Sequence, residues 1–152
     1  MPASPRVFLD TSALFAGIWS PEGGARLLLK LGESRVIQLV INRQVLLEIK
    51  NTLRTKAPSH LGTLVLLLDR SQIEIASQGQ SDITIAQQWV TYPGDARVLA
   101  SVLESKIDYF VTLDRKHFLN NKSLRQAAPF LMGTPGDFLI WYRSYLLRMS
   151  AP

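Results

Sequence analysis

The sequence predicts an α/β domain in which a parallel sheet lies between two layers of helices. Short apolar runs rich in β-branched and aromatic residues recur along the 152 residues, and helical segments of ten or more residues separate them. Strands joined by such long connections pair in parallel, and their sheet needs helices on both faces. Because no internal repeat or low-complexity linker divides the chain, we expect residues 1–152 to form a single domain.

Five segments are predicted to be strands. Each is short and apolar, as expected for a sheet that is buried on both faces. The first and the fourth end on an acid, Asp10 and Asp114, and the third alternates in polarity, which is typical of a strand near an edge. The predicted strands are Val7–Leu9, Val36–Ile41, Ile73–Ala76, Tyr109–Leu113 and Phe130–Met132.

Helices are predicted between these strands from their start and stop signals. Asn42 can cap the helix that follows it, and Gly32 is expected to terminate the second helix. Pro93 and Pro135 are each predicted to begin an amphipathic helix. Proline has no backbone N–H, and the first residues of a helix have no intrahelical acceptor for one. The predicted helices cover residues 11–17, 25–31, 43–55, 59–71, 93–103 and 135–148, with a short one over 83–90.

Composition excludes several classes of function. The chain has no cysteine, which rules out a disulfide scaffold, a thiolate zinc site and a cysteine nucleophile, and its two histidines are too few for a histidine-rich metal centre. The longest aliphatic run, Leu64–Leu68, is far shorter than the roughly 20 residues that span a bilayer. The N-terminal segment lacks a signal-peptide pattern, so we expect a cytoplasmic location and no membrane span.

Four acidic residues are candidates for one shared site. Asp10 and Asp114 follow strands, Asp95 lies in the first turn of its helix facing the sheet, and Glu48 flanks an apolar helical stripe. Each has an ordinary explanation alone, as a cap, a helix-dipole partner or an exposed glutamate. If they converge at about 6 Å, each neighbouring pair repels by roughly 3 kcal/mol at an effective dielectric of about 20. Such a cluster needs protons, basic partners or a divalent cation.

An all-oxygen cluster suits Mg²⁺ or Mn²⁺, and a cation held this way promotes phosphodiester hydrolysis. The chain has 17 basic and 12 acidic residues, and without the four candidate acids the balance is 17 minus 8, or +9. An acidic pocket in a basic surround fits a phosphate-backbone substrate. The basic residues expected to position that substrate are Arg43, Arg97, Arg115 and Lys116.

These residues, in this order, resemble the PIN-domain family of nucleases. The likeness runs from residue 6 to about residue 140 and includes a Thr-Pro-x-x-Phe-Leu segment at Thr134. The four other segments that carry it are Val7–Ser12, Val45–Ile49, Asp95–Ala100 and Phe110–Asp114.

The resemblance implies a three-layer α/β/α fold with strand order 3-2-1-4-5 and a Mg²⁺- or Mn²⁺-dependent endoribonuclease. Asp10, Glu48, Asp95 and Asp114 would hold the metal, and the Thr112 hydroxyl would support them. We expect in-line attack of water that leaves a 5′-phosphate and a 3′-hydroxyl. The chain also resembles the VapC-like toxins of bacterial toxin–antitoxin pairs, which implies an RNA substrate and a protein antitoxin.

The sequence departs from the family pattern in two places. Lys116 stands where many members have a further acid, and Gly94 stands where many have the first of two acids. Two alternatives therefore stay open: a catalytically idle PIN-like module that binds nucleic acid or a partner, and a flavodoxin-like phosphoacceptor domain that uses Asp10 or Asp114. We also expect a homodimer. His117 is interpreted as a surface or supporting residue, and the apolar stripes around Leu64 and Phe138 as core or as partner surfaces.

Overall fold

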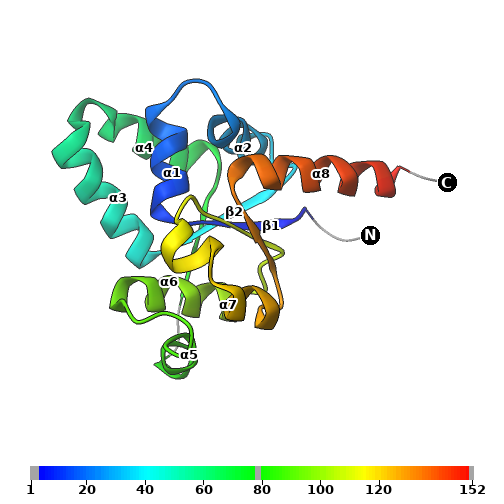
Figure 1. The fold of residues 1–152 in the computed structure, drawn as a ribbon. Helices are drawn as coiled ribbons and strands as arrows, with labels where there is room; N and C mark the ends of the chain where they lie inside the picture. The colour runs from blue at the N-terminus through cyan, green and yellow to red at the C-terminus, as the bar shows by residue number, and fades with distance from the viewer. Residues whose placement is uncertain (1–3, 78–79, 151–152) are drawn as a thin grey trace.

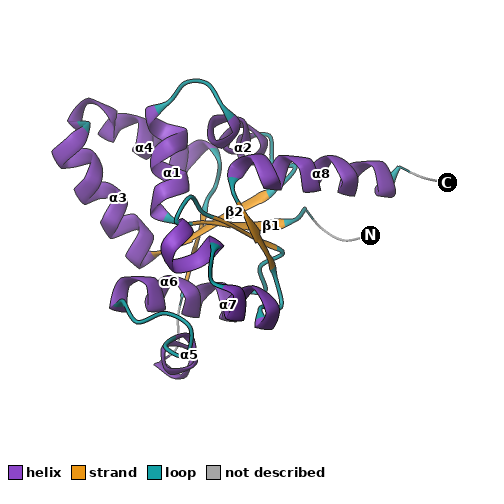
Figure 2. Cartoon of the chain, in the orientation of Figure 1, coloured by secondary structure: helices purple, strands orange, loops and turns teal. Residues whose placement is uncertain are grey.

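Five parallel strands form one sheet in the order β3-β2-β1-β4-β5, as the family resemblance implies. The computed structural model describes residues 4–77 and 80–150, so the first three residues of the N-terminal segment lie outside it. The strands lie between two layers of helices, with α1–α4 and α8 on one face and α5–α7 on the other (Figures 1 and 2). The strands are β1 (Arg6–Leu9), β2 (Gln38–Asn42), β3 (Glu74–Ala76), β4 (Tyr109–Val111) and β5 (Leu131–Gly133).

Helices form the connections as expected, although the helix predicted over residues 83–90 covers Gln80–Ala86, and three short elements are additional. Pro58–His60 forms a 3₁₀ turn (η1) before α4, and Arg115–Leu119 forms a π-helical turn (η2) after β4. The helices are α1 (Thr11–Trp19), α2 (Gly24–Glu33), α3 (Arg43–Lys56), α4 (Leu61–Arg70), α5 (Gln80–Ala86), α6 (Pro93–Glu104), α7 (Lys122–Ala127) and α8 (Pro135–Met149). Neither η2 nor α7 was predicted, because both are too short to show a helical periodicity.

The predicted end of the second helix is wrong. Gly32 does not terminate the second helix, because α2 continues to Glu33 and the left-handed residue is Arg35, with φ of 62°. Gly32 instead packs on the sheet, where a Cβ atom would come within 2.3 Å of Cδ1 of Leu39. A glycine that permits close approach to a strand and a glycine that ends a helix look alike in the sequence.

Capping side chains fix the helices that carry the candidate acids. The Asn42 side chain accepts from the N–H of Val45, as predicted, and its amide nitrogen donates to the carbonyl of Arg97 at 3.0 Å. That second bond ties the start of α3 to the first half of α6. Asp10 caps α1 and Asp114 caps η2, so the capping role and the candidate functional role coexist in both residues.

The core lies on both faces of the sheet. In the central strands β1 and β4, for example, Val7, Phe8 and Phe110 are fully buried. Leu64, Phe138 and Tyr142 are also buried, so a large part of the two apolar stripes on α4 and α8 is core. The C-terminal half of α8 extends away from the body of the molecule (Figure 1). No helix in the part of the chain that the structure describes has both the length and the apolar composition required to cross a bilayer.

Candidate active site

A cavity of about 510 Å³ opens at the carboxyl ends of the central strands. All four candidate acids lie in its wall: Asp10 directly after β1, Asp114 three residues after β4, Glu48 on α3 and Asp95 in the first turn of α6. β1 and β4 are neighbours in the sheet, which brings the first two together. The remaining wall residues are Thr11, Ser12, Phe15, Thr52, Lys56, Val98 and Phe118.

Asp10 is the most buried of the four acids, with 6% of its surface exposed. Its Oδ1 accepts from the backbone N–H of Ala13 at 3.1 Å and from the hydroxyl of Ser12 at 2.6 Å, and its Oδ2 accepts from the hydroxyl of Thr112. Burial raises the pKa of Asp10 to about 6, although these three hydrogen bonds act to lower it. The carboxylate is therefore held rigidly in a site that disfavours its charge.

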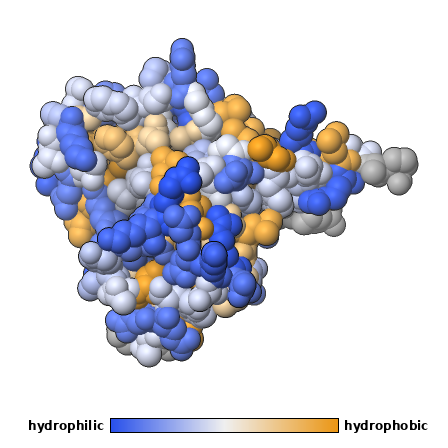
Figure 3. Space-filling view, in the orientation of Figure 1, coloured by the Kyte–Doolittle hydropathy of each residue, from blue (hydrophilic) through white to orange (hydrophobic). Residues whose placement is uncertain are grey.

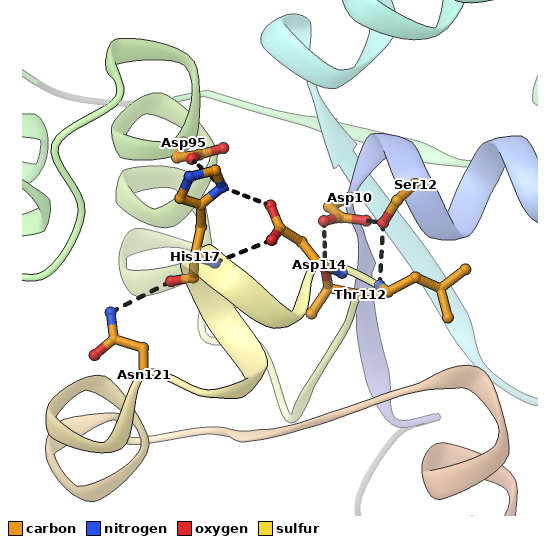
Figure 4. A network of polar contacts seen from close by, with 8 residues as sticks. Asp10, Ser12, Asp95, Thr112, Asp114, His117 and Asn121 are labelled. Carbon is orange, nitrogen blue, oxygen red and sulfur yellow. Dashed lines mark hydrogen bonds and ion pairs between the residues drawn. The ribbon is translucent and has the colours of Figure 1, made fainter.

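Two hydroxyl groups connect Asp10 to the loop after β4 (Figure 4). The Thr112 oxygen donates to Asp10 and accepts from the N–H of Asp114 at 3.0 Å. The Ser12 oxygen also donates to Asp10 and accepts from the N–H of Leu113 at 3.0 Å. These bonds fix the position of Asp114 relative to Asp10. The predicted strand continued to Leu113, whereas β4 ends at Val111 and leaves these N–H groups to the two hydroxyls.

Asp95, Asp114 and His117 form a cluster next to Asp10 (Figure 4). Nδ1 of His117 lies 2.9 Å from Oδ2 of Asp114 and 3.3 Å from Oδ2 of Asp95. Because ionised carboxylates only accept hydrogen bonds, Nδ1 carries the hydrogen when both acids are charged. Burial raises the pKa of Asp95, and nearby Asp114 and Glu48 raise it further, whereas His117 lowers it.

Glu48 approaches the site from the facing helix. Its Oε1 accepts from the hydroxyl of Thr11 at 2.6 Å, and its Oε2 accepts from the side-chain amide of Gln44 at 3.1 Å. Its charge contributes to the raised pKa of Asp95, so the two side chains are electrostatically coupled across the cavity. The α3 register inferred from the apolar stripe is therefore the one that turns Glu48 toward the cavity.

The four predicted substrate-binding cations are more dispersed than the acids. Arg43 and Arg97 line a separate hollow between α3 and α6. Arg115 and Lys116 are exposed on η2, which lies where hydrophilic residues gather across the centre of the face in Figure 3. The acid cavity itself contains a different cation, Lys56 at the end of α3.

Sequence reasoning missed Lys56 and gave His117 only a surface or supporting role. Lys56 stands eight residues after Glu48 and therefore on the same helical face, a signal that was present in the sequence. The position of His117 depends on η2: in this π-helical turn the N–H groups of Leu119 and Asn120 bond carbonyls five residues earlier. No pattern in the sequence predicts that turn.

The donor set fits a hard divalent cation. One ligand atom from each of Asp95, Asp114 and His117 lies within 4.8 Å of the other two. Opposite ligands of an ion with bonds of about 2.1 Å are about 4 Å apart, so the spacing of these atoms is of the size that one ion requires. Metal binding at Nδ1 of His117 requires the tautomer that carries its hydrogen on Nε2. Carboxylate oxygens suit Mg²⁺ and Mn²⁺, and a positive ion would relieve the repulsion that raises the pKa of Asp95.

Comparison with known proteins agrees with this geometry. The family model for the PIN domain matches residues 6–116, which is most of the chain and includes all four acids. The chain belongs to the PIN domain family. Its fold is also similar to that in the crystal structure of VapBC2 from Rickettsia felis, bound to a DNA fragment from their promoter. That match has a TM-score of 0.61 and 15% identity, and covers 85% of this chain and 98% of the other. A search of curated proteins found no match.

Proposed function

We propose that this PIN domain is a Mg²⁺- or Mn²⁺-dependent endoribonuclease that hydrolyses phosphodiester bonds. The observation that carries the proposal is the meeting of four carboxylates, from β1, α3, α6 and the loop after β4, around one cavity. Capping accounts for Asp10 and Asp114 one at a time, but not for their meeting with Glu48 and Asp95. Their mutual repulsion is an energetic cost that a functional site explains.

In this proposal Asp10, Glu48, Asp95 and Asp114 hold the cation, with His117 as a further ligand or a partner of the carboxylates. The cation would supply the Lewis acidity and charge neutralisation that phosphodiester hydrolysis requires. Thr112 and Ser12 keep Asp10 and the Asp114 loop in a fixed relative position through the hydrogen bonds described above. Such preorganisation reduces the rearrangement needed when the substrate phosphate arrives.

Lys56 has a separate role in the proposal. Lys56 is an exposed cation in the wall of the cavity that holds the four acids. It lies about two turns after Glu48 on α3. We assign it to the phosphate group next to the scissile one, where it would offset the repulsion between the RNA and the acids. Arg115 and Lys116, which are exposed on η2, would contact the strand farther out.

A cleavage assay with matched variants tests the proposal. Labelled single-stranded and structured RNAs, and DNA of the same sequence, are incubated with the protein in Mn²⁺, Mg²⁺ or EDTA. We expect RNA cleavage that gives 5′-phosphate ends and disappears with EDTA, Asp10→Asn or Asp95→Asn. Asp69→Asn removes an exposed carboxylate from α4 and should leave the rate unchanged. Cleavage that persists in EDTA and in both site variants would overturn the metal mechanism.

We further propose that the protein is the toxin of a toxin–antitoxin pair and forms a homodimer. The support is the fold it shares with the VapBC2 structure and the exposed apolar side chains of Val65 and Leu66 on α4 and of Ile140 and Leu147 on α8. Growth arrest on induced expression, relieved by co-expression of a protein encoded beside it, tests the first point. Sedimentation velocity tests the second. Normal growth of cells that express active enzyme would contradict the toxin proposal. A monomer at micromolar concentration would contradict the homodimer proposal.

A further inference from the structure

A second hollow, of about 340 Å³, lies between α3 and α6, which pack against each other on the left of the molecule in Figure 1. Its lining contains three cationic side chains and no acidic one. We call it the α3–α6 groove, and the residues that line it are Arg43, Gln44, Leu46, Leu47, Lys50 and Arg97. Such a cluster of like charges attracts an anionic ligand, because nothing in the lining neutralises it.

The three cations face the groove from two helices. Arg43 and Lys50 are seven residues apart on α3, and therefore lie on one face about 10.5 Å apart along the helix axis. Arg97 comes from α6 on the other side. All three side chains are exposed, and within residues 4–77 and 83–150 no salt bridge joins any of them to an acid. One strand of a duplex places about three phosphates along that length of axis, so the spacing suits a polyanion.

The groove adjoins the acid cavity at one pair of hydrogen-bonded side chains. Gln44 lines the groove, and its amide donates at 3.1 Å to Glu48, which lines the cavity. Gly94 of α6 lies against this pair, since a Cβ atom there would be 3.1 Å from Oε2 of Glu48 and 3.3 Å from Nε2 of Gln44. A side chain at position 94 would therefore press on the Gln44–Glu48 pair that lies between the two hollows.

The groove also has an apolar component. Leu47 is 57% exposed and Leu46 is half-buried between the cationic side chains. A simple inorganic anion would make no use of these side chains, whereas a nucleic-acid strand presents sugars and flat bases beside each phosphate. An acidic protein segment would also fit this combination. The position of the groove beside a cavity suited to phosphodiester chemistry favours the nucleic acid.

We propose that the α3–α6 groove binds the nucleic-acid strand that flanks the phosphodiester in the acid cavity. Arg43, Lys50 and Arg97 contact its phosphates, and Leu46 and Leu47 contact its sugars or bases. This inference rests on the proposed nuclease function. It adds that the enzyme binds a substrate more tightly when that substrate extends beyond the scissile dinucleotide, and that these groove contacts contribute to binding rather than to the chemical step.

Binding without cleavage is the first test. A fluorescent 20-nucleotide single-stranded RNA is titrated with the protein in EDTA at several KCl concentrations. The groove variant carries Arg43→Gln, Lys50→Gln and Arg97→Gln. The control variant carries Lys30→Gln, Arg70→Gln and Arg143→Gln, which remove the same charge from exposed positions on α2, α4 and α8. Because all six side chains are exposed, both variants should keep the melting temperature of the parent protein within a few degrees.

We expect the groove variant to bind the RNA at least tenfold more weakly. Its slope of log Kd against log salt should fall by about 2, since each phosphate contact with a single strand contributes about 0.7. The control should change the slope much less. Equal slopes and affinities for the two variants would overturn the inference. It would also be overturned if the groove variant bound RNA as tightly as the parent protein and lost binding only to an acidic protein.

Cleavage in Mn²⁺ separates this inference from the function on which it rests. For a long RNA, the groove variant should show a KM raised at least tenfold with kcat nearly unchanged, whereas a dinucleotide should be cleaved equally by the groove and control variants. If RNA binding depended on the groove but no RNA were cleaved, the proposed nuclease function would be wrong and the groove would still be a nucleic-acid site. If cleavage depended on metal but KM were equal in the two variants, only the inference about the groove would be wrong.

Discussion

Nδ1 of His117 lies 2.9 Å from Oδ2 of Asp114, the residue that caps the π-helical turn on which His117 stands. The same carboxylate accepts the backbone N–H of His117 through its other oxygen at 3.0 Å. The cap, the turn and the imidazole therefore form one local unit, and this unit brings His117 to Asp95 on α6. A turn of this kind, at a cavity lined by acids, agrees with the tendency of π-helical turns to occur at functional sites.

The first prediction concerns metal preference. Nitrogen donors suit Mn²⁺ better than Mg²⁺, so His117→Ala should weaken Mn²⁺ binding by about 10–100-fold and Mg²⁺ binding by less. Titration calorimetry of both ions with the purified protein measures the two losses. His60→Ala, which changes the other histidine of the chain, should leave both affinities unchanged. Equal losses for the two ions would show that His117 acts only by orienting the carboxylates.

The second prediction follows from the buried carboxyl group of Asp10. Its pKa is about 6 in the folded protein, against an ordinary value of 3.8. Between these values the folded state binds more protons than the unfolded state, so the free energy of unfolding falls as the pH rises through this window. A difference of about two pKa units corresponds to roughly 2–3 kcal/mol of stability, lost by neutral pH in the metal-free protein.

Asp10→Asn keeps a side-chain oxygen for the cap of α1 and cannot ionise. In the absence of metal, the stability of this variant relative to the parent should therefore increase by about 2–3 kcal/mol between pH 4 and pH 8. Urea unfolding at both pH values measures this difference. Asp69→Asn, at an exposed position, should give parallel curves. If the curves of the Asp10→Asn variant and the parent were also parallel, the ionised Asp10 side chain would carry no burial cost.

The third prediction isolates the hydroxyl of Thr112. Thr112→Val removes a donor to Asp10 and the acceptor for the N–H of Asp114, and leaves both groups without this partner. We expect a loss of about 1–3 kcal/mol in the free energy of unfolding and at least a tenfold loss of RNA cleavage. Thr112→Ser keeps the hydroxyl and should retain most of the activity. Equal activity of the two variants would assign the effect of Thr112 to packing.

The sequence was most informative where hydrophobic pattern and strand ends coincide. The central strands were predicted because runs such as Val7–Leu9 are apolar throughout, and the parallel arrangement follows from the length of the connections. The convergence of Asp10 and Asp114 on one cavity follows from strand adjacency, which the family resemblance supplied. Their role as metal ligands stays a prediction, as does the extent of the domain over residues 1–152.

The features that escaped prediction depend on close packing rather than on periodicity. The contact of His117 with Asp95 requires η2, and η2 has only five residues, too few to display a helical pattern. The α3–α6 groove depends on how these two helices pack against each other. Arg43 and Arg97 were candidate cations in the sequence, but their grouping with Lys50 in a groove beside the acid cavity appears only in the fold.

The last prediction tests the corrected role of Gly32 with a pair of alanine substitutions. At Gly32, within α2, a Cβ atom would come 2.3 Å from Cδ1 of the fully buried Leu39, so Gly32→Ala should destabilise the protein by about 1–3 kcal/mol. Gly62, in the first turn of α4, has no atom within 4 Å of such a Cβ, and Gly62→Ala should stabilise by up to about 1 kcal/mol through helix propensity. Urea unfolding measures both changes. If both substitutions stabilised the protein, α2 would not press on the sheet at Gly32.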